Sequence, residues 1–268
     1  MRYAIDLAPL GPLADPHALV RLAIAAERAG WDALSTWDVL GTAMGAPAAD
    51  PWVALTAIAA RTERIALMAS VIVLPRRRPQ LVAQAAATLD TWSGGRLILG
   101  IGAGGDPSDF TAFGESFDRH ERISRLDRDA EAIDVWLRGE GDIAVGPRSV
   151  QQPRPPILVG GMRPGALRRA ARWDGWIGVA TSEDGSSMVL APDDFERMVR
   201  DVRAERVALG RADEPLEIGV FGTSAPGDRQ VSDDFRAAGA TWWLEILSPL
   251  RGSADELLER IKVGPPVA

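Results

Sequence analysis

The chain contains no cysteine and few of the side chains that enzymes most often use for covalent or acid–base chemistry. Without cysteine, disulfides, cysteine-ligated metal centres and thiol nucleophiles are excluded. The single lysine, Lys262, lies close to the C-terminus, so lysine-based phosphate binding and Schiff-base chemistry are not expected. Two histidines, His17 and His120, cannot build a polyhistidine metal site. Carboxylates are therefore the main acid–base candidates, and an enzyme of this composition would need an organic cofactor.

The sequence also lacks an excess of positive charge and any long apolar run. Its 30 basic and 37 acidic residues give a formal net charge of −7, which offers no attraction to nucleic acid or to an anionic membrane. Asp6 interrupts the first apolar run where a signal peptide would need continuity, and no apolar run reaches the roughly 18 residues of a membrane span. We expect a cytoplasmic protein without nucleic-acid or membrane partners.

Short apolar runs alternate with helical patterns along the whole chain, which is typical of βα units around a parallel sheet. Asp15 followed by Pro16 predicts one helix start, and the Ser253/Glu256 capping box predicts another. Eight strands and eight helices in this length predict a single (β/α)8 TIM barrel, an α/β fold, as one domain over 1–268. The expected strands cover 3–7, 32–36, 65–73, 97–101, 157–159, 176–179, 216–221 and 241–247.

A polar segment at 102–120 separates strand 97–101 from the following amphipathic helix. We expect this insertion on the catalytic face of the barrel, because it follows the C-terminal end of a strand. Its first residues continue the glycine run 100–105, which matches G-x-G-x-x-G. A dinucleotide-binding motif is disfavoured because no helix opens at the third glycine. Either Gly102 and Ala103 keep the backbone low beneath a planar ligand, or the run forms a turn with positive φ.

Motifs spread over most of the chain resemble the bacterial luciferase-like monooxygenase family. They read TERIA at 62–66, LPRRRP at 74–79, ATLD at 87–90, SGGRLILGIGAG at 93–104, DFTAFGE at 109–115, PILVGG at 156–161 and AARWDG at 170–175. The resemblance implies a (β/α)8 barrel that binds FMN or the deazaflavin coenzyme F-420, without a metal. It further implies a flavin-dependent oxidoreductase or monooxygenase that acts on a small organic substrate.

The resemblance also implies two sets of cofactor-binding residues. Members of the family often carry a non-proline cis peptide at the position of Ser70 and Val71, where it supports the ring; an ordinary buried strand is the alternative. The loop Gly160-Gly161-Met162-Arg163 matches the phosphate-holding loop, assisted by Thr181, and free N–H groups at a helix start would favour an anion there. A simple strand-to-helix turn is the alternative.

Two carboxylates are candidate catalytic groups. Relatives commonly show Trp-Asp-His where this chain has Trp37, Asp38 and Val39, so the family histidine is missing. The resemblance places Trp37 at the cofactor and Asp38 near the ring or substrate, although Asp38 could instead cap the following turn. Glu245 shares one side of its strand with Trp243. If that side faces the lumen, Glu245 is a candidate base; if it faces outward, Glu245 is a surface charge.

Helix 52–60 is apolar almost all round, which predicts that a second subunit covers it and that the protein is a homodimer. The resemblance leaves a separate flavin reductase open as a further partner. Two other functions stay open as well. Val39 and the short connection 139–156 are compatible with a flavin-binding barrel that has lost turnover. A flavin-free phosphate-site barrel isomerase is disfavoured by the shortage of lysine.

Overall fold

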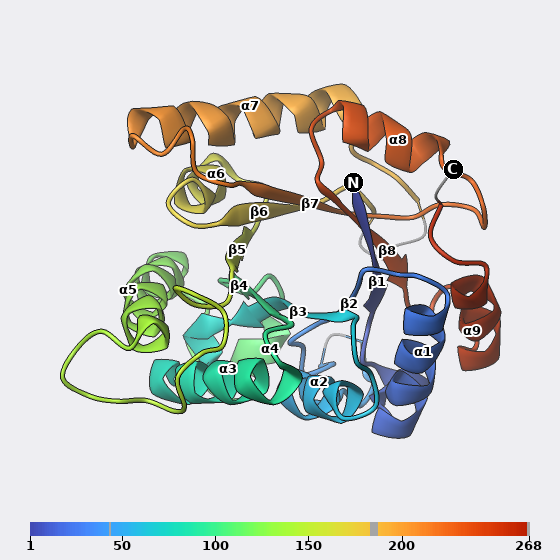
Figure 1. Cartoon of the computed structure of the whole chain (residues 1–268), viewed down its shortest axis with the longest axis horizontal. Coiled ribbons are helices and arrows are strands. Elements are labelled where there is room, and N and C mark those ends of the chain that lie inside the picture. The colour runs from blue at the N-terminus through green and yellow to red at the C-terminus, as the bar shows by residue number, and fades with distance from the viewer. Residues whose placement is uncertain (43, 183–186, 267–268) are drawn as a thin grey trace.

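The computed structural model describes residues 1–42, 44–182 and 187–266, and its eight parallel strands close into a barrel (Figure 1). Each strand pairs with the next one along the chain, and β8 pairs with β1. This closed ring confirms the (β/α)8 barrel predicted from the alternation of strands and helices. The strands are β1 (Arg2–Leu7), β2 (Ala33–Thr36), β3 (Ala66–Val73), β4 (Leu97–Gly102), β5 (Ile157–Gly160), β6 (Gly175–Val179), β7 (Glu217–Gly222) and β8 (Trp242–Leu247).

The helices lie outside the strands, and local sequence signals set many of their ends (Figure 1). The carboxylates of Asp15 and Asp50 accept N–H groups at the starts of α1 and α2, and Ser253 with Glu256 forms the predicted capping box of α9. Gly94 and Gly139 end α3 and α5 in the left-handed conformation. The helices are α1 (Pro16–Arg28), α2 (Pro51–Ala59), α3 (Pro79–Ser93), α4 (Ser108–Thr111), α5 (Arg119–Arg138), α6 (Pro164–Ala170), α7 (Pro192–Ala208), α8 (Gln230–Ala237) and α9 (Ala254–Lys262), with 3-10 turns at Gly11–Ala14 and Leu74–Arg76.

The insertion after β4 contains the short helix α4, which the sequence pattern did not predict. Asp109 of this helix is buried and accepts the N–H of Leu40, the hydroxyl of Thr42 and the guanidinium of Arg76. Burial works to raise the pKa of Asp109, but these hydrogen bonds and the charge of Arg76 outweigh it and lower the pKa. The insertion is thereby attached to the segments that follow β2 and β3.

Alternate side chains of each strand point into the barrel and outward to the helices. On β8, Trp242, Leu244 and Ile246 pack in the lumen, whereas Trp243 and Leu247 belong to the layer between strands and helices. The buried lumen residues with which they pack are Ala4, Ala33, Met68, Leu158, Ile177 and Phe221. The lumen is therefore filled at its lower end, which leaves ligand space only near the carboxyl ends of the strands.

The ladder between β3 and β4 is irregular where Ser70 and Val71 meet the glycine-rich end of β4. The Ser70–Val71 peptide is cis, as predicted, and the register shifts between Ala69 and Ile72. A Cβ on Gly100 would lie 2.5 Å from the carbonyl oxygen of Ala69. The glycine at this position thus makes room for the neighbouring strand.

In the ranges that the structure describes, no helix combines the length and the apolar character that crossing a membrane requires.

Candidate active site

A pocket of about 1240 Å³ opens at the carboxyl ends of the strands. It brings together residues from the ends of β2 to β6 and from the starts of α5 and α6. Every residue that the sequence suggested for cofactor binding lines it: Trp37, Ser70, Val71, Gly102, Ala103, Gly160, Gly161, Met162, Arg163 and Thr181. The parallel barrel explains this convergence, because all strands end at the same face.

Val71 forms the centre of one wall and lies between two glycines. A Cβ on Gly102 would lie 2.5 Å from its Cγ2, and a Cβ on Gly160 would lie 2.7 Å from its Cγ1. Real Cβ atoms do not approach other carbons this closely, so both glycines are required by the side chain of Val71. The wall is consequently flat and apolar, which suits the face of an aromatic ring system.

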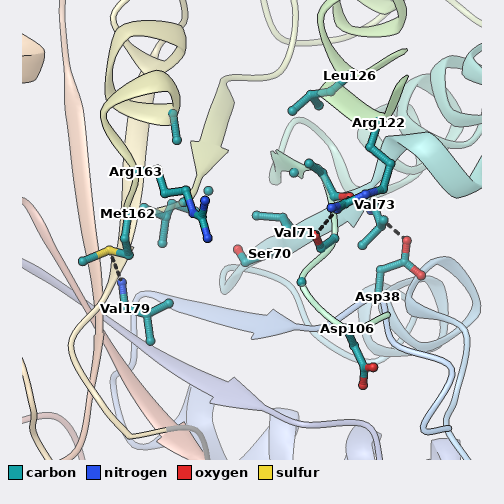
Figure 2. Close-up of a pocket in the computed structure, with 18 of the residues that line it drawn as sticks. Asp38, Ser70, Val71, Val73, Asp106, Arg122, Leu126, Met162, Arg163 and Val179 are labelled. Carbon is teal, nitrogen blue, oxygen red and sulfur yellow. Dashed lines mark hydrogen bonds between the residues drawn. The ribbon is translucent and has the colours of Figure 1, made fainter. Parts of the chain in front are cut away.

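The loop from Gly160 to Arg163 is held by contacts with β6. The indole N–H of Trp176 donates to the carbonyl of Gly161 at 2.7 Å, and the N–H of Val179 contacts the sulfur of Met162 at 3.1 Å (Figure 2). The N–H of Gly161 donates to the carbonyl of Ile177 at 3.3 Å, so it is not free for an anion as the sequence suggested. Helix α6 has only seven residues, and the stronger anion-binding group is the side chain of Arg163. Figure 2 shows this side chain reaching into the pocket opposite Ser70 and Val71.

Other arginines line the same pocket, among them Arg119, Arg122 and Arg168, which the sequence did not indicate. Like Arg163, Arg119 and Arg168 make no ion pair to a carboxylate in the described ranges. The buried Arg122 donates to the carbonyls of Ala103 at 3.0 Å and Gly104 at 2.7 Å. Its guanidinium lies 3.7 Å from the ring centre of Phe117, and burial lowers its pKa. These arginines cluster because α5 and α6 are neighbours around the barrel. No local sequence motif encodes that proximity.

Asp38 lines the pocket, but its carboxylate is already engaged. Arg77 donates to both of its oxygens, at 2.8 and 2.7 Å, and the N–H of Val73 donates at 2.9 Å (Figure 2). The guanidinium of Arg76 lies 3.3 Å away. The oxygens of Asp38 already accept from Arg77 and from the N–H of Val73, and Arg76 lies beside them, so this geometry speaks against the predicted acid–base role. It supports a role in fixing the turn after β3.

Glu245 faces away from the lumen, contrary to the orientation that a catalytic base would need. It is fully buried and accepts hydrogen bonds from the N–H and hydroxyl of Ser224, from the indole of Trp243 and from Arg251. The expectation that Trp243 and Glu245 share one side of β8 is confirmed. Because that side packs against the helices, Glu245 is neither a pocket base nor a surface charge but part of a buried ion pair.

Asp6 of β1 is a buried acid. The sequence indicated only that Asp6 interrupts the first apolar run, and it did not suggest Asp6 as a site residue. Asp6 is inaccessible to solvent and accepts the indole N–H of Trp37 at 2.5 Å. Burial raises the pKa of Asp6 to about 7, despite the opposing effects of Ser35 and Trp37. The sequence feature that could have pointed to Asp6 is its position as the single acid among the apolar residues of this strand.

Among the described residues, no group of three or more histidines and carboxylates is arranged to hold a metal ion.

Comparison with known proteins identifies relatives on both sequence and structure. A sequence model of luciferase-like monooxygenases matches residues 3–238. The F420-dependent glucose-6-phosphate dehydrogenase of Nakamurella multipartita is 34% identical over 201 residues, covering 69% of this chain and 58% of the relative. The FMNH2-dependent dimethylsulfone monooxygenase of Pseudomonas putida is 28% identical over 213 residues, covering 75% and 55%.

Among solved structures, the coenzyme F420-dependent tetrahydromethanopterin reductase of Methanopyrus kandleri superposes with a TM-score of 0.76 at 18% identity, over 98% of this chain and 96% of the other. At this identity the superposition supports the fold alone. The matches span between about half and two thirds of the length of the curated relatives. Because the family match covers most of the barrel, the chain belongs to the luciferase-like monooxygenase family.

Proposed function

We propose that this chain is an oxidoreductase that binds a phosphate-bearing flavin or deazaflavin in the pocket and acts on a small apolar substrate. The observation that carries the proposal is Arg163, which reaches into the pocket with no carboxylate partner in the described ranges, next to the flat wall at Val71. An unpaired guanidinium beside an apolar wall is suited to a ligand with an aromatic ring and an anionic tail.

The residues present fit such a cofactor. Val71, Ile177 and Trp37 offer apolar surface to a ring, while Arg163 and the hydroxyl of Thr181 lie where a phosphate could be held. When bound, the cofactor would supply the transfer of a hydride or the activation of oxygen. The protein would contribute orientation of the ring, exclusion of water by the apolar walls and a fixed counter-charge for the tail.

Of the two cofactors, the arginines favour F-420. FMN carries one phosphate, whereas F-420 carries a phosphodiester followed by glutamate carboxylates. Arg119 on α5 and Arg168 on α6 line the same pocket as Arg163 and have no carboxylate partner in the part of the chain described. Several unpaired guanidinium groups stabilise several negative charges better than one group does. We therefore infer tighter binding of F-420 than of FMN.

The carboxyl face of the barrel, where the pocket opens, favours an apolar substrate. The end of β6 and the loops that follow β2, β4, β6 and β8 expose large hydrophobic side chains, of which Val179 lines the pocket, although such residues are usually buried. They are Leu40, Met44, Phe113, Val179, Val189 and Leu250. A substrate that covers these groups would gain free energy by removing apolar surface from water.

A barrel that binds flavin without turnover is the second candidate, and two observations favour it. Val39 lines the pocket where relatives commonly carry histidine, and the carboxylate of Asp38 is committed to Arg76 and Arg77. Val39 has no proton to exchange, and the oxygens of Asp38 are occupied by donors of this chain. Binding and turnover must therefore be measured separately.

The test begins with purified protein titrated with FMN and with F-420, oxidised and reduced, and followed by absorbance and fluorescence. We expect saturable binding of F-420 that weakens at high salt, because the contact is largely electrostatic. Binding of neither cofactor would refute the proposal. Reduced cofactor bound to the protein is then mixed with oxygen or with a panel of ketones, aldehydes and alkenes. Binding without accelerated reoxidation would support the non-catalytic candidate instead.

A further inference from the structure

Asp6 lies in the layer of the lumen directly beneath the pocket. Along β1 it alternates with Ala4, which packs in the lumen, and its partners in register are Ser35 on β2 and Ile246 on β8. Ile246 lines the pocket, and so does Trp37, whose indole donates to Asp6. The carboxyl group is therefore one hydrogen bond away from the ligand space.

The polar surroundings of Asp6 are incomplete. Its Oδ1 is buried without a hydrogen-bond partner, and so are the hydroxyls of Ser35 and Ser70, the latter in the pocket wall. Asp129 also has a carboxylate oxygen without a partner, but it forms an ion pair with Arg128, and the remaining buried acids of the described chain are better satisfied. Asp90, for example, accepts two backbone N–H groups and the amide of Gln151, and Glu245 is paired with Arg251. A buried carboxyl with one donor is poorly stabilised in its charged form.

In the described ranges, no cation stabilises a negative charge on Asp6. The side chains that face Asp6 are Ser35 on β2 and Trp37 just after β2, and its neighbour on β8 is Ile246. The charged groups of the same region are turned elsewhere: Asp38 to Arg76 and Arg77, and Glu245 outward to Arg251 and Arg260. On α1 and α9, at the outer face of β1, Arg21 pairs with Asp255 and Lys262 with Glu259. Burial is thus the dominant influence on the pKa of Asp6 and raises it to about 7.

We propose that Asp6 is a positioning residue: it sets the orientation of the Trp37 ring in the pocket wall, and gain or loss of a proton on Asp6 changes that hydrogen bond. In the carboxylate form both oxygens are acceptors, and the indole N–H is held by a charge-assisted bond. In the acid form the group donates one proton, and the Ser35 hydroxyl is its neighbour in register. The pocket wall therefore differs between the two forms, while the barrel around it stays the same.

The test uses the protein without cofactor, so its outcome is independent of the proposed function. Tryptophan labelled with nitrogen-15 gives one indole signal for each of the nine tryptophans, and Trp37→Phe identifies the signal of Trp37. We expect that signal to shift in one step between pH 5 and 9 with a midpoint near 7, and the step to vanish in Asp6→Asn. Asp32→Asn is the matched control, because Asp32 also accepts a hydrogen bond from the start of β1, from the N–H of Tyr3, but lies at the other end of the strand.

A Trp37 signal that is constant with pH, or that titrates unchanged in Asp6→Asn, would overturn the proposal. A second measurement stands even if Asp6→Asn does not fold. In protein labelled with carbon-13 at the aspartate carboxyl groups, the carboxyl of Asp6 should be the one that titrates near neutral pH. Because the Trp37 hydrogen bond lowers the pKa of Asp6, Trp37→Phe should move this midpoint upward. An unmoved midpoint would show that the two groups are not coupled.

Discussion

The side chain of Val71 occupies the space that a side chain at Gly160 would need. The two residues come from β3 and β5, and a Cβ on Gly160 would lie 2.7 Å from the Cγ1 of Val71. Gly102 on β4 meets the same valine from another side. Three strands thus build one flat wall. The wall keeps this shape because Val71 carries the methyl groups while Gly102 and Gly160 have no side chain.

Replacing Gly160 with alanine should therefore displace Val71 and lower the free energy of unfolding by about 1–3 kcal/mol, the usual cost of overpacking. The double variant Gly160→Ala/Val71→Ala should recover most of this loss, because the clashing methyl groups are gone. Gly105→Ala is the control, since a Cβ there meets nothing within 4 Å. Urea denaturation measures each value. Equal stability of Gly160→Ala and Gly105→Ala would contradict the proposed contact.

Arg163→Ala should weaken the binding of a phosphate-bearing cofactor by about tenfold or more. A hydrogen bond to a charged group contributes about 1.5–3 kcal/mol, and tenfold corresponds to about 1.4 kcal/mol. Arg200→Ala on α7 removes the same charge from an exposed helix position outside the pocket and should leave binding unchanged. Fluorescence titration of both variants checks the difference. Equal affinities would move the anion site away from Arg163.

Asp38→Asn should lower stability rather than act only on chemistry. The substitution leaves Arg76 and Arg77 facing a neutral amide in a buried setting, and breaking a buried ion pair costs about 3–5 kcal/mol. Asp255→Asn breaks the exposed pair with Arg21 and should change stability by less than about 1 kcal/mol. Urea denaturation compares the two. Unchanged stability with a large loss of turnover would restore Asp38 as a candidate catalytic residue.

The stability contributed by Asp6 should decrease as pH rises. Its pKa is about 7 in the folded protein, against 3.8 for an unperturbed aspartate, so the folded state binds more protons in this interval and is favoured at low pH. The free energy of unfolding that Asp6 contributes falls between about pH 4 and about pH 7. The total loss is roughly 4 kcal/mol, because each pKa unit of difference corresponds to about 1.36 kcal/mol. Asp6→Asn should lack this contribution. The difference between the two proteins in urea, at pH 5 and pH 8, isolates it from other carboxylates; a constant difference would refute it.

We propose that the protein is a homodimer in which the second subunit covers α2 and α3. Val53 on α2 is 62% exposed, and Leu81 and Trp92 on α3 are 56% and 64% exposed. Val53→Glu or Leu81→Glu should place charge in that interface and produce monomers, because a buried unpaired charge is costly. Val207→Glu, on α7, changes an equally exposed valine and should not affect assembly. Light scattering at micromolar concentration distinguishes these outcomes, and a monomeric parent protein would exclude the dimer.

The barrel itself could be predicted because its signals are local. Alternation of apolar runs with capped helices placed the eight strands, and the ends of most of them agree with the structure to within one residue. The resemblance to the family indicated the residues of the pocket lining, and the parallel strands bring them together because their carboxyl ends lie at one face. Ser70, Gly161 and Arg163 thus meet in the pocket although they are far apart in the chain.

The sequence alone determined the family, the barrel and the face that carries the pocket, whereas tertiary structure decided what each buried acid does. Strand alternation shows that Trp243 and Glu245 share a side, but both sides of a barrel strand are apolar, so only packing shows that this side faces the helices. Asp38 is engaged by Arg76 and Arg77 from another strand end, and Asp6 lies among apolar lumen residues with no cation beside it in the part of the chain that the structure describes. Charge partners and desolvation depend on three-dimensional neighbours, which no local pattern specifies.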